Sequence, residues 1–200
     1  MNIVLHEPGI ALNTGNIGRS CAATDSSLHL IRPYGFHISE KEIKRAGMDY
    51  WDKIDLHEYI DYDDFLEKHP EISFGGAREE AGAEASEAYN NGIRSSLSNH
   101  PDSQAAEQND RAEGDAPRLW FATTKAHHAY TEVCFGPNDY IMLGNESRGI
   151  PEEILVQHPD ACIRIPMWGD IRSLNLANSA AIILYEALRQ NGFENMERYG

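Results

Sequence analysis

Three short polar segments hold the residue types that could bind or transform a ligand. They are Asn13-Thr-Gly-Asn-Ile-Gly-Arg19, Gly144-Asn-Glu-Ser-Arg-Gly149 and the stretch from Met167 to Asn175. Backbone N–H groups at a helix start attract anions, so a helix starting in the first segment, with Arg19 one turn in, would suit an anion. None of the three is a Walker P-loop or a Gly-x-Gly-x-x-Gly dinucleotide loop. The segments therefore indicate a ligand site of another kind.

Each polar segment follows, or is followed by, a pattern that predicts regular structure. Apolar runs bounded by Gly, Pro and Asn predict strands at residues 2–6, 27–31, 54–60, 118–122, 139–143 and 161–165. Helices are predicted within 13–24 and at 39–46, 62–68, 152–157 and from about 173 to 189. Strands that alternate with helices predict an α/β fold: a mostly parallel sheet with helices on both faces. Loops at the carboxyl ends of such strands converge on a ligand.

The last predicted helix begins directly after the third polar segment. Ser173 and Asn175 can both act as its N-cap, and Asn191-Gly192 can end it. Its first turns carry small residues, from Ala177 to Ala181, which permit close approach of another backbone. An ordinary core helix is the alternative interpretation of this segment.

Charge is concentrated in one part of the chain. The 200 residues carry a formal net charge of −15, which by itself argues against a nucleic-acid partner. Residues 71–117 contain ten Asp or Glu and three Arg, a net of −7 that leaves −8 on the remainder. The remainder can still carry a local basic patch, for which the candidates are Arg19, Lys41, Lys44, Arg45 and Lys53. Solvated surface charges are the alternative.

The acidic segment 71–117 also has few large apolar residues and no sustained period. We expect a disordered insertion there, within a single domain that spans residues 1–200. The three Cys are odd in number and unpaired by motif, and adjacent His127 and His128 diverge on either a helix or a strand, so no metal site is predicted. No apolar run approaches the roughly 20 residues that cross a bilayer, so we expect no membrane partner and a cytoplasmic location.

Taken in order, the three polar segments resemble the three motifs of the SpoU branch of the SPOUT RNA methyltransferases. The second reads Leu143-Gly-Asn-Glu-Ser-Arg-Gly-Ile-Pro151, and the third combines Ile165-Pro-Met167 with Arg172-Ser-Leu-Asn-Leu-Ala-Asn178. Two further segments are similar to the corresponding segments of the enzymes that methylate the tRNA wobble nucleotide. They are Arg45-Ala-Gly-Met-Asp-Tyr-Trp51 and Leu5-His-Glu-Pro8. The resemblance covers about residues 1–70 and 118–193.

The resemblance implies an S-adenosylmethionine-dependent methyltransferase that acts on the ribose 2′-hydroxyl of nucleotide 34 in the tRNA anticodon stem-loop. It also implies a deep C-terminal trefoil knot and a homodimer. Threading of this kind could not be expected on general grounds, because it is almost absent from proteins.

The resemblance also assigns roles to individual positions. Its cofactor-binding positions correspond to Ala122, Gly144, Ile165 and Ser173, and its loop-ordering acidic residue to Glu146. Its arginine beside the reacting ribose corresponds to Arg19. Because a guanidinium stays protonated, we expect Arg19 to hold a phosphate and polarise the hydroxyl rather than remove its proton.

The remaining polar residues of the motifs complete the predicted catalytic set. Asn16, Ser173 and Asn175 are candidates for hydrogen bonds to the ribose or the cofactor. Two other functions stay open: methylation of another tRNA position or of rRNA, and a non-catalytic dimeric RNA-binding module of the same fold. The base preferred at the modified nucleotide also stays open.

Overall fold

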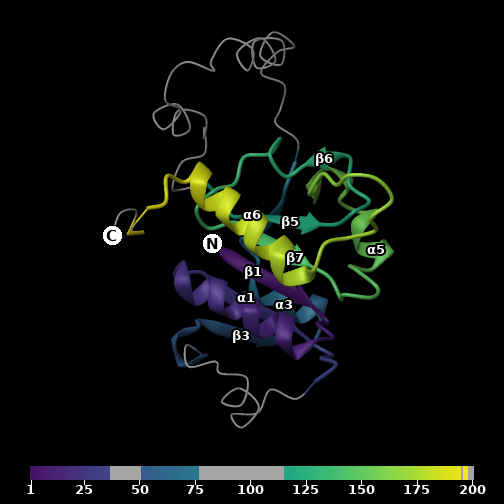
Figure 1. The fold of residues 1–200 in the computed structure, drawn as a ribbon. Coiled ribbons are helices and arrows are strands. Elements are labelled where there is room, and N and C mark those ends of the chain that lie inside the picture. The colour runs from purple at the N-terminus through teal and green to yellow at the C-terminus, as the bar shows by residue number, and fades with distance from the viewer. Residues whose placement is uncertain (37–50, 77–114, 195, 198–200) are drawn as a thin grey trace.

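A single parallel sheet organises the chain, with helices packed on both of its faces (Figure 1). The computed structural model describes residues 1–36, 51–76, 115–194 and 196–197. The sheet has eight strands in the order β3-β2-β1-β7-β5-β8-β6, and β4 also pairs with β5. Every pairing between described strands is parallel. The predicted α/β architecture is therefore confirmed.

All six predicted strands are present, three with the predicted bounds and three shorter, together with two strands too short to recognise from a pattern. The bounds are β1 Asn2–His6, β2 Ser27–Ile31, β3 Leu56–Tyr59, β4 Ser73–Phe74, β5 Arg118–Ala122, β6 His128–Ala129, β7 Tyr140–Leu143 and β8 Cys162–Arg164.

The α-helices follow the prediction in order and approximate length, and two short 3₁₀ helices, η1 and η4, were not predicted. Their bounds are α1 Ala11–Ala23, η1 Trp51–Lys53, α3 Tyr62–Lys68, α5 Glu152–Leu155, η4 Pro159–Ala161 and α6 Leu176–Gln190. The helix predicted at 39–46, and with it Lys41, Lys44 and Arg45 of the predicted basic patch, lies outside the described residues.

Apolar side chains fill the space on both faces of the sheet, which is why the central strands carry consecutive apolar residues, as in Ile3–Leu5 and Leu119–Phe121. One face packs against α1 and α6; its core includes Ile3, Leu5, Leu28, Leu30, Ile141, Ile183 and Leu184. The other packs against α3 and α5; its core includes Val4, Ile31, Phe65, Phe121, Met142 and Ile154. Figure 1 shows α1 and α6 lying next to each other across the first face.

The starts of α1 and α6 correct two predictions. Helix α1 begins at Ala11, before the first polar segment, so Arg19 lies about two turns in rather than one. Asn175 alone is the N-cap of α6, because its Oδ1 accepts bonds from the N–H groups of Ala177 and Asn178 at 2.9 and 3.3 Å. Ser173 precedes the helix and does not cap it.

The acidic insertion begins later than the predicted residue 71. Ser73 and Phe74 form β4, which lies parallel to the start of β5, and the Gly75 N–H donates to the Leu119 carbonyl at 3.0 Å. A Cβ on Gly75 would lie 2.4 Å from the ring of Trp120, so this position requires glycine. Residues 71–76 therefore belong to the fold, and the expected disorder of 77–114 lies outside the described residues.

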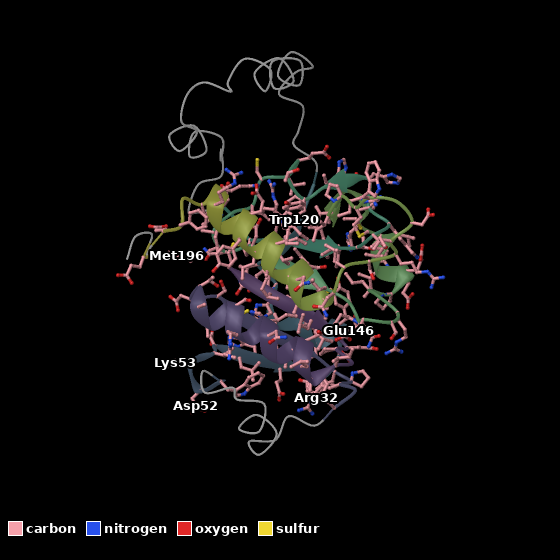
Figure 2. The ribbon with its side chains drawn as sticks, viewed as in Figure 1. Arg32, Asp52, Lys53, Trp120, Glu146 and Met196 are labelled. Carbon is pink, nitrogen blue, oxygen red and sulfur yellow. The ribbon has the colours of Figure 1, made fainter. Side chains whose placement is uncertain are left out.

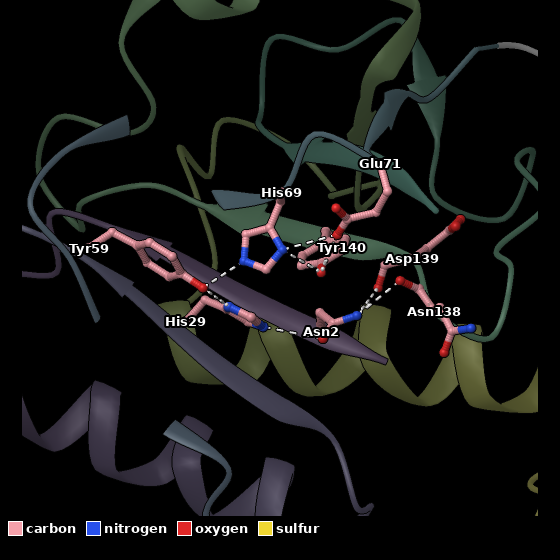
Figure 3. Close-up of polar contacts among 8 residues, drawn as sticks. All are labelled: Asn2, His29, Tyr59, His69, Glu71, Asn138, Asp139 and Tyr140. Atoms are coloured by element: carbon pink, nitrogen blue, oxygen red, sulfur yellow. Dashed lines mark hydrogen bonds and ion pairs between the residues drawn. The ribbon is translucent and has the colours of Figure 1, made fainter. Parts of the chain in front are cut away.

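A chain of buried polar side chains crosses the sheet face that carries α3 (Figure 3). His29, only 2% exposed, lies 2.8 Å from the Tyr59 hydroxyl through Nδ1 and 3.2 Å from Asn2 Oδ1 through Nε2. The Tyr59 hydroxyl lies 2.7 Å from Nε2 of His69, whose Nδ1 lies 3.1 Å from the Tyr140 hydroxyl. Burial, and then the charges of neighbouring imidazoles, lower the pKa of His29 to about 3. Burial therefore keeps His29 neutral within this network.

Candidate active site

A cavity of about 640 Å³ lies where the carboxyl ends of β5, β7 and β8 meet the start of α6. The segments that line it follow these strands directly; they are 122–125, 143–150 and 172–176, with Ile163, Ile165 and Met167. Ile10 and Asn13 line it from the start of α1, Ser179 and Ile183 from α6, and Leu155 from α5. The second and third polar segments therefore meet at one cavity, and the first reaches it through Asn13.

A relay of hydrogen bonds ties the three segments together. Glu146 accepts bonds from the Gly9 N–H through Oε2 at 2.8 Å and from the Asn13 amide through Oε1 at 2.9 Å. Asn13 Oδ1 in turn accepts a bond from the Asn175 amide at 3.0 Å, while Asn175 Oδ1 caps α6. Figure 2 shows Glu146 beside the ends of α1 and α6 that face the cavity. The carboxylate thus fixes the orientation of two amides and of a helix start.

The loop after β7 is compact because its backbone folds closely onto itself. The Gly149 N–H donates to the Asn145 carbonyl at 2.7 Å, and a Cβ on Gly144 would lie 2.1 Å from the backbone of Gly149 and Ile150. Gly149 itself has φ of 74°, a conformation that favours glycine. Both glycines of this motif are therefore required by geometry.

The Asn145 side chain fastens the same loop to the end of β1. Its Nδ2 donates to the Glu7 carbonyl at 2.7 Å, and its Oδ1 accepts from the Ser147 N–H at 3.0 Å. Asn145, to which the sequence analysis assigned no role, is thus part of the loop's internal support.

Two of the three cations that line the cavity are paired. Arg148 contacts Glu7 at 2.8 Å, and Lys125 contacts Glu152. Arg172 is exposed and has no ion pair within the described part of the chain. Among the described residues, Arg172 is therefore the lining cation that is most available to an anionic ligand.

The structure brings most of the predicted site residues together. Ala122, Gly144, Ile165 and Ser173, predicted to bind the cofactor, all line the cavity, and so do Glu146 and Asn175. These placements leave the roles of the individual residues as predictions.

Arg19 and Asn16 are placed differently. Both lie on the exposed side of α1 and are not among the described residues that line the cavity. The cavity lining, as far as the structure describes it, therefore lacks the predicted arginine.

Asn13 is the site residue that the sequence reasoning missed. It is 6% exposed and stands in the middle of the relay, although it opens the first polar motif. Its position at the head of that motif was a usable signal. Its hydrogen-bond partners Glu146 and Asn175, 133 and 162 residues further along the chain, were not predictable from the pattern.

No group of three or more His, Cys, Asp or Glu among the described residues is placed to hold a metal ion. In the same part of the chain, no helix has the length and apolarity needed to cross a membrane.

Comparison with known proteins agrees with this geometry. A relative from Lactococcus lactis subsp. cremoris is 37% identical over 200 residues, covering 98% of this chain and 92% of its own; it carries the provisional name tRNA (cytidine(34)-2′-O)-methyltransferase. A Photorhabdus asymbiotica relative with that name, unqualified, is 36% identical over 195 residues, covering 96% of this chain and 95% of its own.

Solved structures show the same likeness. One solved structure matches with a TM-score of 0.69 and 33% sequence identity, over 96% of this chain and 95% of the other chain. It is described as giving structural insights into the 2-OH methylation of C/U34 on tRNA. The sequence model of the SpoU rRNA methylase family matches residues 1–93 and 95–185. This chain belongs to the SpoU methylase family.

Proposed function

We propose that this protein transfers a methyl group from S-adenosylmethionine to the ribose 2′-hydroxyl of nucleotide 34 in tRNA, with either cytidine or uridine as the base. The observation that carries the proposal is the convergence of the motif loops on one cavity, joined by the Glu146–Asn13–Asn175 relay. The names of relatives that match nearly the whole chain support the choice of tRNA and of position 34.

The cavity suits a nucleoside-containing cofactor. Its volume of about 640 Å³ lies within the usual range of small-molecule sites, roughly 300–1,000 Å³. Apolar side chains suited to an adenine ring line it, among them Leu143, Ile150, Ile163 and Ile165. Gly144, which tolerates no side chain, keeps the backbone close to the same space. When bound, the cofactor supplies an electrophilic methyl group on a sulfonium.

The chain's own contribution is to position the ribose. Methyl transfer needs the attacking oxygen in line with the methyl carbon, and positioning of that kind contributes several kcal/mol, within the ~7–11 kcal/mol attributed to full orientation. Ser173 and Asn175 lie at the mouth of the cavity and are the candidate hydrogen-bonding partners of the ribose. The protonated Arg19 would polarise the 2′-hydroxyl and hold the phosphate.

For Arg19 to act, a second protomer has to complete the site. The exposed side of α1 that carries Asn16 and Arg19 continues onto α6, where Ile182 and Tyr185 expose 38% and 45% of their surface. Apolar residues on adjacent helices suit a homodimer interface. We propose that this dimer brings Arg19 of one protomer to the cavity of the other. The C-terminal knot stays a prediction.

Three measurements test the proposal. Calorimetry should detect S-adenosylmethionine binding, a methylation assay on total tRNA should give product, and ribose-methylation mapping should place it at nucleotide 34. Arg19→Ala should keep cofactor affinity while losing most activity. Binding of tRNA with neither cofactor binding nor methyl transfer would identify a non-catalytic RNA-binding module instead.

The matched family is described as one of rRNA methylases, so rRNA is the second candidate substrate. Mapping of methylated rRNA in the same assay separates the two substrates. Product in rRNA alone, or at another tRNA nucleotide, would refute the assignment to position 34. The cytoplasmic location expected from sequence stays a prediction.

A further inference from the structure

The loop between β8 and α6 carries a tryptophan that the site described so far does not use. Trp168 exposes 94% of its surface, more than any other large apolar side chain among the described residues, and Ile171 in the same loop exposes 62%. A tryptophan can bury about 150–250 Å² on binding, so exposure of this kind beside a cavity indicates a contact surface.

The position of Trp168 places it at the rim of the cavity. Met167, the preceding residue, and Arg172, four residues further on, both line the cavity. Gly169 follows with φ of 65°, so the chain turns directly after the tryptophan. The loop is held at one end by β8 and at the other by Asn175, whose amide is bonded to Asn13. The indole is therefore carried by a loop fixed at both ends to the site.

The charges around Trp168 suit a phosphate-bearing ligand. Arg172 is the lining cation that has no ion pair in the described part of the chain, whereas Arg148 and Lys125 are paired. Asp170 is the one acidic residue of the 166–175 loop and lies two positions from each of Trp168 and Arg172. An aromatic face beside an unpaired guanidinium matches the chemistry of single-stranded RNA, whose bases stack and whose phosphates attract cations.

We infer that Trp168 is a stacking platform for one unpaired nucleobase of the RNA substrate, and that Arg172 contacts an adjacent phosphate. The inference rests on the proposed function, because an anticodon loop offers unstacked bases next to the methylated ribose. Stacking on the indole would hold the nucleotide while its ribose enters the cavity. Trp168 is therefore a positioning residue for the reaction.

Kinetics on an anticodon stem-loop RNA test the inference. Trp168→Ala should raise KM for the RNA roughly 5- to 150-fold, the equivalent of ~1–3 kcal/mol of base stacking, while cofactor affinity stays unchanged. Trp168→Phe, which keeps an aromatic face, should recover most of the loss, whereas Trp168→Leu should not. Ile60→Ala, at a residue that is 72% exposed and does not line the cavity, is the matched surface control and should behave as wild type.

An RNA carrying a single abasic nucleotide identifies the stacked base. The abasic site is moved through the anticodon loop one position at a time, and each RNA is assayed with wild type and with Trp168→Ala. At the stacked position the two proteins should have the same KM, because the base that the indole contacts is already missing. An effect of Trp168→Ala that persists with every abasic RNA overturns the inference.

Intrinsic fluorescence supplies a readout that does not depend on turnover. Trp120 is fully buried and Trp51 is partly buried, so Trp168 is the tryptophan most accessible to a bound RNA. Addition of the stem-loop should quench wild-type emission, and Trp168→Phe should lose that quenching while it still binds the RNA. Equal quenching in both proteins overturns the inference.

The outcomes separate this inference from the proposed function. Wild type that methylates the stem-loop, together with an unchanged KM in Trp168→Ala, refutes stacking alone. Wild type that binds cofactor but does not methylate the stem-loop refutes the proposed function and the inference with it. Dissociation of the protein into a smaller species in Trp168→Ala, measured by sedimentation, would instead assign the indole to contact between two copies of the chain.

Discussion

Replacing one carboxylate oxygen of Glu146 by an NH₂ group tests the direction of the hydrogen bonds in the Glu146–Asn13–Asn175 relay. Glu146 is acceptor-only, so the Asn13 amide must donate to it and must accept from Asn175 through Oδ1. Glu146→Gln can keep one acceptor for the Gly9 N–H but then directs its own NH₂ group at the Asn13 NH₂ group. A flip of Asn13 would only move the conflict to Asn175, whose Oδ1 is needed to cap α6.

The size of the effect follows from the burial of Asn13, which is 6% exposed. One polar group left unsatisfied costs about 1–3 kcal/mol, and replacing a charged by a neutral bond to Gly9 costs about 1 kcal/mol more. Glu146→Gln should therefore lower the free energy of unfolding by roughly 2–4 kcal/mol. Asn13→Asp should also be costly, because two carboxylates about 4 Å apart repel by up to about 4 kcal/mol at an effective dielectric of 20.

The double variant decides whether the relay has been understood. In Glu146→Gln with Asn13→Asp, the Gln donates to the new carboxylate, which still accepts from Asn175, so every group is satisfied again. The free energy of unfolding of the double variant should return to within about 1 kcal/mol of wild type. This corresponds to a coupling free energy between the two substitutions of at least ~2 kcal/mol. Glu152→Gln, in an exposed ion pair, is the control and should change stability by less than about 1 kcal/mol.

Urea unfolding and calorimetric titration with S-adenosylmethionine measure the two consequences of this cycle. The single variants should lose both stability and cofactor affinity, since the relay holds the loops that line the cavity. Additive losses in the double variant would refute the assigned bond directions, and unchanged cofactor affinity in the singles would refute the link between relay and cavity.

Three further predictions follow from the fold. Gly144→Ala should abolish cofactor binding in calorimetry, because its Cβ would lie 2.1 Å from the Gly149 backbone; wild-type affinity would refute the close approach. The His29 pKa is lowered to about 3 in the folded protein, so between about pH 6.5 and pH 3 the unfolded chain binds a proton at His29 that the folded protein does not. The contribution of His29 to stability should therefore be full above about pH 6.5 and fall toward pH 3, by at most about 4–5 kcal/mol. In urea unfolding against pH, His29→Gln should flatten that slope, and an unchanged slope would contradict the assignment. Replacing 77–114 by about a dozen flexible residues should leave methylation intact; the link cannot be shorter, because the parallel pair β4–β5 needs a crossover. A folded but inactive replacement would show that 77–114 contributes to activity.

The secondary structure was largely predictable because its signals are local. Apolar runs such as Asn2–His6 and Tyr140–Leu143 are buried on both faces, and hydrophobicity at consecutive positions records that burial directly. Helix α3 was predicted with its observed bounds, and the structure adds that Asp61 is its N-cap, whose side chain accepts from the Asp64 N–H. The two-residue β4 carries no such signal, which is why the acidic insertion was predicted to begin too early.

The candidate site was predictable only in part. The position of the loops at the carboxyl ends of parallel strands follows from sheet topology, so the convergence of Gly144, Ile165 and Ser173 could be expected. The sequence could not decide whether Ser173 or Asn175 is the N-cap of α6, because both side chains can accept bonds from free N–H groups. In the structure the N-cap is Asn175, and a hydrogen bond to Asn13 also fixes the orientation of its amide.

By itself, the sequence determined the alternation of strands and helices, the family motifs and the set of polar residues available for chemistry. Only the tertiary structure decided which of these residues meet. Glu146 contacts Asn13 across 133 positions of the chain, and Arg19 lies on the exposed side of α1, not among the described residues that line the cavity. The reason is physical: periodicity reports which face of an element is buried, whereas contacts between distant segments depend on strand order, register and the start of each helix.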